Sequence, residues 1–319
     1  RWRLSYLITF LPHTRRRRLA WNRATRRRRS STVYTPMRLT PPPPPAGGRR
    51  KRRGQTGSFG YPSALFKALA PPGTPAGGPH GRWVAVRRFD NVKTTARIAA
   101  AAQEAWAHGG GGGTGGGGGA LAGHPHLVAL RAVALDRGAL FFTHDYHPCA
   151  ATLEERHLLP EGAPGAEPLP EGLLWAYILQ LYSAISAVHS ANLACRNICP
   201  THILNVGGDR ICLNSCGVVD VLEFESRKAM VAMQQEDLEA LGRTVVQLAC
   251  RSAAAAGSPE ALEGSLGVVG AAYAPALGAL CRALLHPQGR TVHQVGAGHL
   301  GPALGAALPR ARAREARLE

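Results

Sequence analysis

The side chains best suited to chemistry in this sequence favour phosphate binding over proton transfer. Arg87 follows the apolar run Val84-Ala85-Val86, and a guanidinium is a planar fork of donors that binds phosphate oxygens well. Asn197 lies in the polar segment 195–204, and its neutral amide cannot accept a proton from a substrate hydroxyl. The sequence has no Ser/His/Asp arrangement and no paired acids that suggest hydrolysis. These residues therefore favour binding of a phosphate-bearing ligand without its turnover.

Four cysteines have a spacing that could hold a metal ion. Cys195 and Cys199 form one C-x-x-x-C pair, and Cys212 and Cys216 form a second pair 12 residues further on. The alternative is that they are small packing residues, because they fall in segments that read as apolar core. We expect packing residues and no metal site. The seven cysteines of the chain form no spaced disulfide framework, which indicates a reducing compartment.

These side chains must be positioned by strands in the first half of the chain and by helices in the second. Ser63 to Ala68 and Arg82 to Phe89 alternate in polarity like a hairpin of two strands, and an Ala-rich helix is expected from Thr95 to Ala107. Apolar residues then recur at helical spacing in four segments: 173–189, 234–250, 259–271 and 274–285. The pattern predicts an α+β fold with its strands first.

The positive charge is concentrated at the N-terminus. Residues 1–53 carry 16 Arg, one Lys and no acid, which accounts for 17 of the net charge of +18. We expect residues 1–58 to be a disordered tail whose composition fits a transit peptide, a nuclear-localisation patch, an RNA-binding arm or a spacer outside the native coding sequence. The glycine run 109–119 lacks the Lys-Ser/Thr of a phosphate loop and reads as a flexible insertion. Leu4 to Pro12 is too short and too closely flanked by arginine to span a membrane, so we expect no membrane protein.

The order of elements, with one helix inside a strand-rich first third and a helical remainder after a short hinge, is typical of protein kinases. Arg87 then stands where kinases have the lysine that grips the α- and β-phosphates. Glu104, 17 residues further on, is expected to pair with it from the helix. Arginine in place of lysine keeps the phosphate contact possible.

The segment 195–204 aligns with the kinase catalytic loop, and it departs from that loop in chemistry. Asn197 takes the place of the base, His202 the place of the metal-binding amide, and Ser215 the place of the metal-binding aspartate. With the base and both metal ligands replaced, phosphoryl transfer is expected to be negligible. Asp237 aligns with the buried aspartate that braces this loop in kinases, although its spacing also fits an ordinary carboxylate in the first turns of a helix.

Four segments together resemble the PAN3 family, the pseudokinase subunits of poly(A)-nuclease deadenylation complexes: 145–148 before Thr152, 193–196 before Pro200-Thr201, 213–222, and 235–238 with Leu241-Gly242. The resemblance implies a two-lobed kinase-like fold, with a β-rich N-lobe over 59–144 that contains the insertion 109–119 and a helical C-lobe over 145–300. Residues 301–319 would begin a C-terminal helix or coiled coil. Because the family's coiled coil and nuclease-binding domain would follow Glu319, we expect the chain to be a fragment.

The resemblance also implies a function. The family member would be a cytoplasmic, catalytically inactive scaffold that binds ATP without hydrolysing it and forms a homodimer. It would recruit the catalytic exonuclease subunit, with poly(A)-binding protein, to polyadenylated mRNA, and it would have no membrane partner. Nucleotide contacts are implied at Arg87, at Thr201 and His202, and along a hinge made of Asp145, Tyr146, His147, Pro148, Cys149, Ala150, Ala151 and Thr152. The alternatives are an atypical active protein kinase and an RNA-binding protein that acts through its basic tail.

Overall fold

The computed structural model describes residues 59–74, 76–108, 121–160, 167–225 and 228–301. The predicted tail 1–58, the glycine insertion 109–119 and the predicted helix start at 302–319 lie outside the described residues. The chain divides into two compact units: the first holds Arg1–Gln103 and Leu130–Tyr146, and the second holds Glu104–Ala129 and His147–Glu319.

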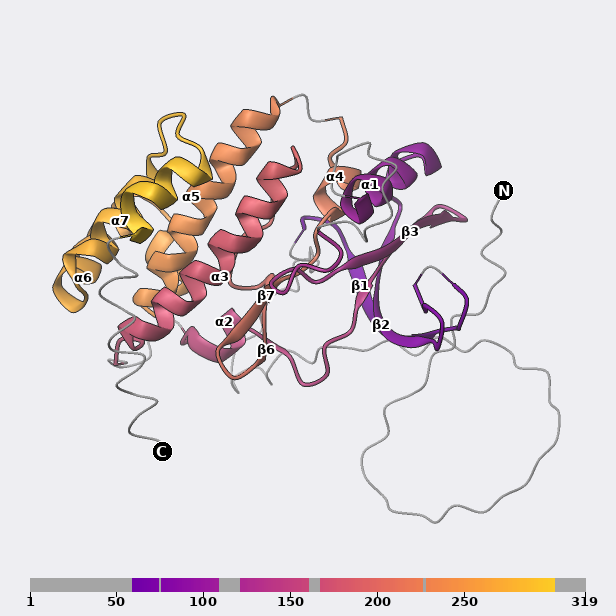
Figure 1. The fold of residues 1–319 in the computed structure, drawn as a ribbon, viewed down its shortest axis with the longest axis horizontal. Helices are drawn as coiled ribbons and strands as arrows, with labels where there is room; N and C mark the ends of the chain where they lie inside the picture. Colours follow the sequence, from indigo (N-terminus) through magenta and orange to yellow (C-terminus); the bar gives the residue numbers. More distant parts are fainter. Residues whose placement is uncertain (1–58, 75, 109–120, 161–166, 226–227, 302–319) are drawn as a thin grey trace, which may run out of the picture. The chain divides into compact units, whose positions relative to one another are not determined.

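The first unit contains a four-stranded antiparallel sheet in the order β1-β2-β4-β3 (Figure 1). Its strands are β1 (Ser63–Ala70), β2 (Arg82–Asp90), β3 (Leu130–Asp136) and β4 (Ala139–Asp145). The predicted hairpin is confirmed, because β1 pairs with β2 and places Ala68 opposite Val84. Alternation along both strands buries every second side chain, and one buried cluster contains Phe66, Ala68, Val84 and Val86.

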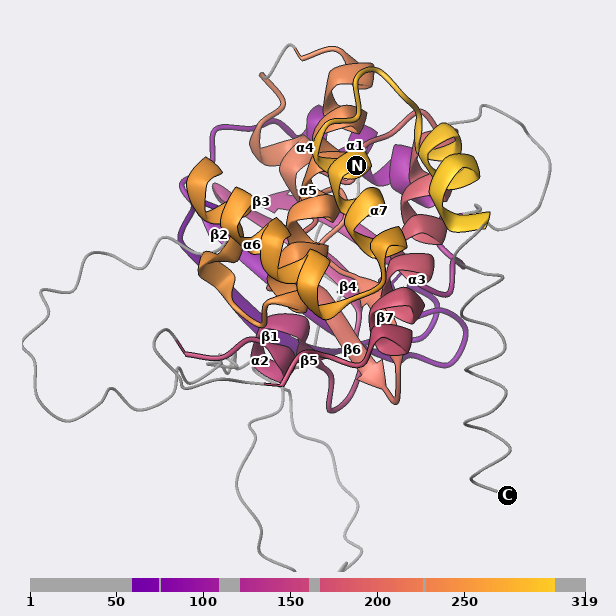
Figure 2. The same cartoon turned by 90° about the vertical axis from the view of Figure 1, so that its left-hand side faces the viewer.

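Helices make up most of the second unit. The helices α3 (Glu171–Ser190) and α5 (Met230–Ala249) lie side by side, and α6 (Pro259–Ala272) and α7 (Pro275–Leu285) pack against α5 (Figures 1 and 2). A small sheet joins β5 (Ala151–Thr152), β6 (Ile203–Gly207) and β7 (Arg210–Leu213). The short helices are α2 (Leu153–His157), α4 (Val218–Leu222) and a 3₁₀ turn at Ala253–Ala256. The helix α1 (Ala96–His108) begins in the first unit and ends in the second.

The strand-first, helix-later order confirms the predicted kinase-like α+β fold. The four predicted helical segments correspond to α3, α5, α6 and α7, with ends that differ by a few residues. The largest difference is at α5, which begins at Met230 although the periodic pattern begins only at Gln234.

One described helix, α3, is long and apolar enough to cross a membrane by length and composition, with a mean hydropathy of 1.2 in its best window. The expectation of no membrane protein took Leu4 to Pro12 as the longest apolar run, and α3 corrects this because it is longer. The apolar stripe of α3 is buried within the second unit, at Leu174, Ile178, Leu181, Ile185 and Val188. Burial against α5 and β7 explains the composition of this helix.

A buried histidine makes the stability of the second unit depend on pH. His157, at the end of α2, is 8 % exposed, and its Nε2 lies 3.0 Å from the Tyr177 hydroxyl, which also accepts from Asn205 Nδ2 at 3.4 Å. Burial, followed by the charges of Arg156 and Arg251, lowers the pKa of His157 below its ordinary value of 6.5.

The unfolded chain therefore takes up a proton at this histidine at a higher pH than the folded chain does. We expect the free energy of unfolding to fall as the pH drops below about 6.5, until the lower pKa of the folded state is passed. Urea unfolding at several pH values, for the wild type and for His157→Gln, measures this effect. An equally steep loss in the variant, which cannot titrate at this position, would assign the acid sensitivity to other groups.

Candidate functional site

Arg87 is a desolvated cation on the sheet of the first unit. It lies on β2, with Leu65 of β1 and Phe142 of β4 as its cross-strand partners. Its Nη1 donates to Ser63 Oγ at 3.2 Å, and its guanidinium carbon lies 5.2 Å from the centre of the Phe59 ring. Burial lowers the pKa of Arg87 to about 10, which still leaves it charged at neutral pH. The ion pairs within the described part of this unit do not include Arg87.

The predicted partner Glu104 belongs to the second unit, so the structure does not test the Arg87–Glu104 pair.

The first two hinge residues, Asp145 and Tyr146, are already engaged within the first unit. Asp145 accepts two hydrogen bonds from Arg131, one of them from Nε at 2.8 Å, and one from Arg82 at 3.2 Å. Burial alone would raise the pKa of Asp145, but these two arginines outweigh it and lower the pKa. The Lys67 ammonium lies 4.5 Å from the centre of the Tyr146 ring and 4.5 Å from that of Trp83. Both side chains therefore have partners within the first unit.

The rest of the hinge belongs to the second unit. Cys149 is exposed and has a left-handed backbone with φ of 58°, while Ala151 and Thr152 form β5 and pair with β6. The Thr152 hydroxyl accepts from Glu155 N at 3.1 Å, and the Glu155 carboxylate accepts from Thr152 N at 2.9 Å. This capping box starts α2, so Thr152 has a structural role in the second unit. The remaining hinge positions are exposed or half-buried: His147, Pro148 and Ala150.

The predicted nucleotide contacts Thr201 and His202 lie in the loop before β6. The buried His202 has its Nδ1 3.1 Å from the Asn197 carbonyl oxygen and 3.3 Å from Cys199 Sγ. The Cys199 sulfur is also 2.9 Å from the Thr201 hydroxyl. Burial raises the pKa of the Cys199 thiol, so it is protonated at neutral pH. At the position where kinases have a metal-binding amide, this chain therefore has an imidazole that is hydrogen-bonded within its own loop.

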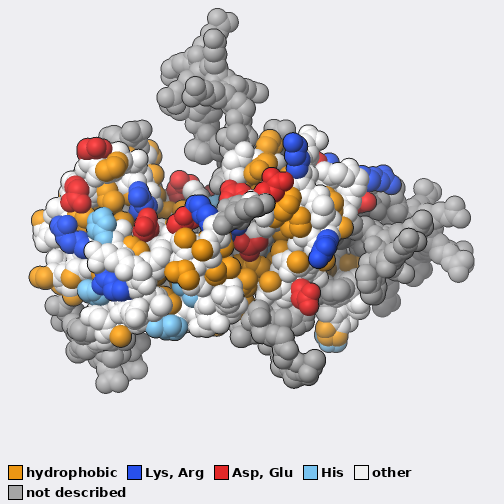
Figure 3. Space-filling model, turned by 90° about the horizontal axis from the view of Figure 1, so that it is seen from above, with side chains coloured by type: hydrophobic (Ala, Val, Ile, Leu, Met, Phe, Trp, Pro, Cys, Tyr) orange, Lys and Arg blue, Asp and Glu red, His pale blue; other side chains and the backbone are white. Residues whose placement is uncertain are grey.

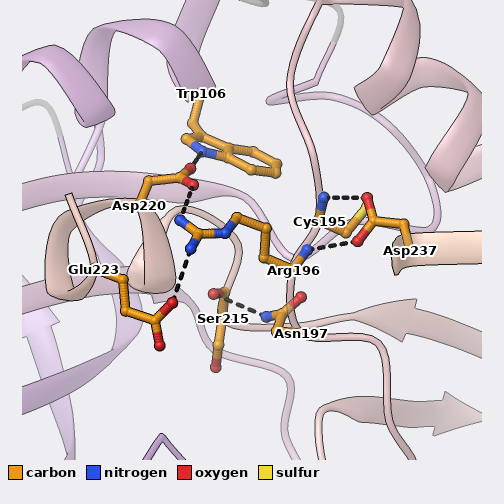
Figure 4. Close-up of polar contacts among 8 residues, drawn as sticks. All are labelled: Trp106, Cys195, Arg196, Asn197, Ser215, Asp220, Glu223 and Asp237. Atoms are coloured by element: carbon orange, nitrogen blue, oxygen red, sulfur yellow. Dashed lines mark hydrogen bonds and ion pairs between the residues drawn. The ribbon is translucent and has the colours of Figure 1, made fainter. Parts of the chain in front are cut away.

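Asn197 acts as a hydrogen-bond donor at the position of the kinase base. It is 7 % exposed, and its Nδ2 donates to the carbonyl oxygens of Asn214 at 2.7 Å and Ser215 at 3.0 Å. Figure 4 shows the bond to Ser215. Ser215 is itself buried and follows β7. Neither of these residues, nor His202, brings a carboxylate to this part of the second unit. In kinases, carboxylates at the base position and at the position of Ser215 accept the substrate proton and bind a metal ion.

The four cysteines with zinc-like spacing are buried or half-buried. Cys195, Cys212 and Cys216 are buried, whereas Cys199 is half-buried. The Cys212 thiol donates to Pro125 O at 3.3 Å, and burial raises the pKa of each of these thiols. No three metal-ligating side chains gather anywhere in the described ranges, which favours the interpretation of these cysteines as packing residues.

Asp237 braces the loop, which decides between the two roles that its spacing left open. Its side chain is 1 % exposed and accepts from His189 Nε2 at 2.9 Å. It also accepts from Cys195 N at 2.6 Å and from Arg196 N at 2.7 Å (Figure 4). Both backbone donors belong to the loop that carries Asn197, and Arg196 has a left-handed φ of 58°. The carboxylate thereby fixes a strained part of the loop from the interior of α5.

A polar cluster that sequence reasoning missed joins the end of α1 to α4. Trp106 Nε1 donates to Asp220 Oδ2 at 2.7 Å, and Arg196 donates to Asp220 at 3.4 Å and to Glu223 at 2.8 Å (Figure 4). Burial raises the pKa of Asp220, while the Trp106 hydrogen bond and the charge of Arg196 oppose that rise. The Glu223 side chain is half-exposed, and Figure 3 shows further Asp and Glu side chains on the surface of the molecule. The only signal in the sequence is the spacing of Asp220 and Glu223, one helical turn apart on α4.

No protein-family model matches the chain. The PAN2-PAN3 deadenylation complex subunit pan3 of Dictyostelium discoideum is 34 % identical to it over 200 residues, which are 61 % of this chain and 24 % of the relative. PAN3 of Coccidioides immitis is 31 % identical over 199 residues, which are 61 % of this chain and 28 % of the relative. The chain thus aligns with about a quarter of the length of these curated relatives.

Solved structures of PAN3 pseudokinases have the same fold as this chain. The match to the Drosophila melanogaster PAN3 pseudokinase covers 81 % of this chain and 64 % of the Drosophila chain, with a TM-score of 0.64 and 24 % sequence identity. A chain in a complex of Neurospora crassa PAN2 (WD40-CS1) with PAN3 (pseudokinase and C-term) is also similar. That match covers 85 % of this chain and 64 % of the Neurospora chain, with a TM-score of 0.64 and 25 % sequence identity. In sequence the chain is similar to PAN3 subunits over about 60 % of its length, and it shares the fold of the solved PAN3 pseudokinases.

Proposed function

We propose that this chain is the catalytically inactive, ATP-binding pseudokinase part of a regulatory subunit in a PAN2–PAN3-type deadenylation complex. The observation that carries the proposal is the use of Asn197 as a donor to two backbone carbonyls, at the position where a kinase needs a proton acceptor. General base catalysis alone contributes about 10²–10⁴-fold to a rate, and kinases add metal-ion positioning to it. With His202 and Ser215 at the metal positions, both contributions are lost.

Nucleotide binding is supported by Arg87 in the first unit. Its guanidinium is charged and desolvated, and its neighbours Ser63 and Phe59 are neutral. An anion that reached it would form charge-assisted hydrogen bonds in a medium of low polarity, where they are stronger than in water. The ligand we propose is ATP, held by Arg87 through its phosphates, by the backbone of the hinge 145–152, and by Thr201 and His202.

The partners are proposed from the family. One solved relative is a complex of PAN2 with PAN3, and the curated relatives are named as subunits of that complex. We therefore propose that this chain contributes to recruiting a catalytic exonuclease subunit to polyadenylated mRNA in the cytoplasm, together with poly(A)-binding protein and as a homodimer. Co-purification with a PAN2-type nuclease, using a chain extended beyond Glu319 and the present chain for comparison, tests the central contact.

Arg87→Ala is expected to weaken ATP binding about tenfold or more without unfolding the chain, because a hydrogen bond to a charged group contributes about 1.5–3 kcal/mol. A thermal-shift titration with ATP, in Mg²⁺ and in EDTA, measures the affinity through the stabilisation that bound ligand provides. Arg87→Lys should recover part of the affinity, because the positive charge remains.

Arg88→Ala is the matched control. Arg88 is the next residue on β2, and it forms an exposed ion pair with Asp90. Its loss should leave ATP affinity unchanged. Equal affinity in the wild type and in Arg87→Ala would refute the phosphate contact. Phosphoryl transfer by the wild type that disappears in Arg87→Ala would instead establish an active kinase.

A further inference from the structure

The segment that follows β7 has a backbone conformation that needs support. Ser215 has a φ of 61° and Gly217 has a φ of 78°, and both values lie in the left-handed region. A residue with a side chain rarely adopts this conformation without compensation from its surroundings. Ser215 is also 2 % exposed, so water cannot satisfy its backbone groups. The contacts of residues 214–217 must therefore hold this conformation.

Hydrogen bonds from three directions hold the segment. Asn197 Nδ2 donates to the Asn214 and Ser215 carbonyl oxygens at 2.7 and 3.0 Å. Asn214 N donates to the His202 carbonyl oxygen at 2.8 Å, and Asn214 Oδ1 accepts from Ser215 N at 2.7 Å. Asn197 is the one side chain outside the segment in this set, and it binds two successive carbonyls at once.

The orientation of the Asn197 amide follows from its acceptors. The reverse orientation would place Oδ1 against two carbonyl oxygens, so the amino group must face them. The residue before it, Arg196, is fixed by the bond from its backbone N to Asp237, and the Asn197 carbonyl oxygen lies 3.1 Å from His202 Nδ1. The backbone on both sides of the Asn197 side chain is therefore held by hydrogen bonds, on one side through Arg196 N and on the other through the Asn197 carbonyl oxygen.

We propose that Asn197 is a positioning residue that clamps the segment 214–217 in a single conformation and thereby sets the start of α4. Gly217 is the N-cap of α4, and the next turn brings Asp220 to Trp106 and Arg196. All of these residues belong to the second unit. The clamp involves no bound nucleotide, so a negative result in its test would overturn the clamp alone and not the proposed ATP binding.

The clamp depends on an amide and is incompatible with a carboxylate. Asn197→Asp would put an anionic oxygen where the amino group now donates, facing two carbonyl oxygens in a buried site. The aspartate could be accommodated only by taking up a proton or by displacing the segment, so its pKa in the folded state must rise. This provides a signature of the clamp that loss of packing alone does not produce.

The experiment compares Asn197→Asp with Asn197→Ala in the full chain by thermal unfolding at pH 8 and pH 5. Both variants should melt about 5 °C or more below the wild type at pH 8, with Asn197→Asp the lower of the two. At pH 5 the difference in melting temperature between the two variants should narrow, because a protonated carboxyl group donates one hydrogen bond and no longer repels the carbonyl oxygens. The charged and titratable groups around this position are Arg196, His202, Asp220 and Asp237, and Asn197→Ala is the reference for their contribution because it retains all four.

Asn192→Asp is the matched control, because Asn192 is exposed in the turn after α3 and its replacement should give no such pH-dependent gap. Hydrogen exchange supplies a second readout: amides of residues 215–222 should exchange at least tenfold faster in Asn197→Ala than in the wild type. An unchanged gap at the two pH values, a wild-type melting temperature for Asn197→Asp at pH 8, or unchanged exchange in Asn197→Ala would each overturn the clamp. If Asn197→Asp does not fold at pH 8, the exchange measurement on Asn197→Ala decides.

Discussion

Replacing Asp237 with alanine is expected to lower the free energy of unfolding by about 3–5 kcal/mol. The carboxylate accepts two backbone N–H groups and a histidine in a site that water does not reach. Its removal leaves buried donors without an acceptor, at Cys195 N, at Arg196 N and at His189. Each orphaned donor costs about 1–3 kcal/mol, although the three losses are not additive. Chemical denaturation followed by circular dichroism measures the change.

Two further variants make this result specific. Asp237→Asn keeps one acceptor oxygen and should fall between the wild type and Asp237→Ala. Glu236→Ala removes the neighbouring acid, whose ion pair with Lys228 is exposed, and should change stability by less than about 1 kcal/mol. A loss in Asp237→Ala no larger than in Glu236→Ala would show that the brace contributes little.

Phe142→Ala should destabilise the first unit by about 3–5 kcal/mol. Phe142 is 0 % exposed, and its ring meets the Phe89 ring edge-on at a centroid distance of 5.9 Å. The substitution removes buried apolar surface, leaves a cavity and breaks this aromatic pair. Proteolysis or hydrogen exchange of β2 and β4 measures the effect where it arises, independently of the second unit.

Phe142→Leu is the control for this prediction, because it keeps most of the buried volume and should cost much less than the alanine variant. Equal losses for leucine and alanine would mean that the ring-to-ring contact, rather than the filled volume, holds the sheet. A loss below about 1 kcal/mol in both would contradict a core position for Phe142.

The helices were predictable because burial imposes a period on their sequence. In α3 the apolar residues from Leu174 to Val188 repeat every three or four positions, and the structure buries that stripe. The start of α5 was not predictable in this way. Its first turn carries Met230 and the exposed Val231, so apolar residues there do not report a buried face.

Some residues of the candidate site could also be found from local sequence patterns, whereas the contacts of others depend on the fold. Arg87 could be found because a cation directly after an apolar strand is a local pattern, and Asn197 because its loop has a recognisable frame. The bond between Trp106 and Asp220 joins residues 114 positions apart, and no local pattern encodes it. The role of Asp237 required knowing which way two backbone N–H groups point, which is a property of the folded loop.

The two carbonyl oxygens beside the Asn197 amide also bear on the evolution of this chain. An asparagine codon becomes an aspartate codon by a single base change, so a carboxylate at position 197 is one mutation away. Here that mutation would destabilise the loop around Asn214 and Ser215. Selection would remove such a variant for its instability before any activity could favour it. The contact that holds the loop therefore also disfavours the appearance of a carboxylate base at this position.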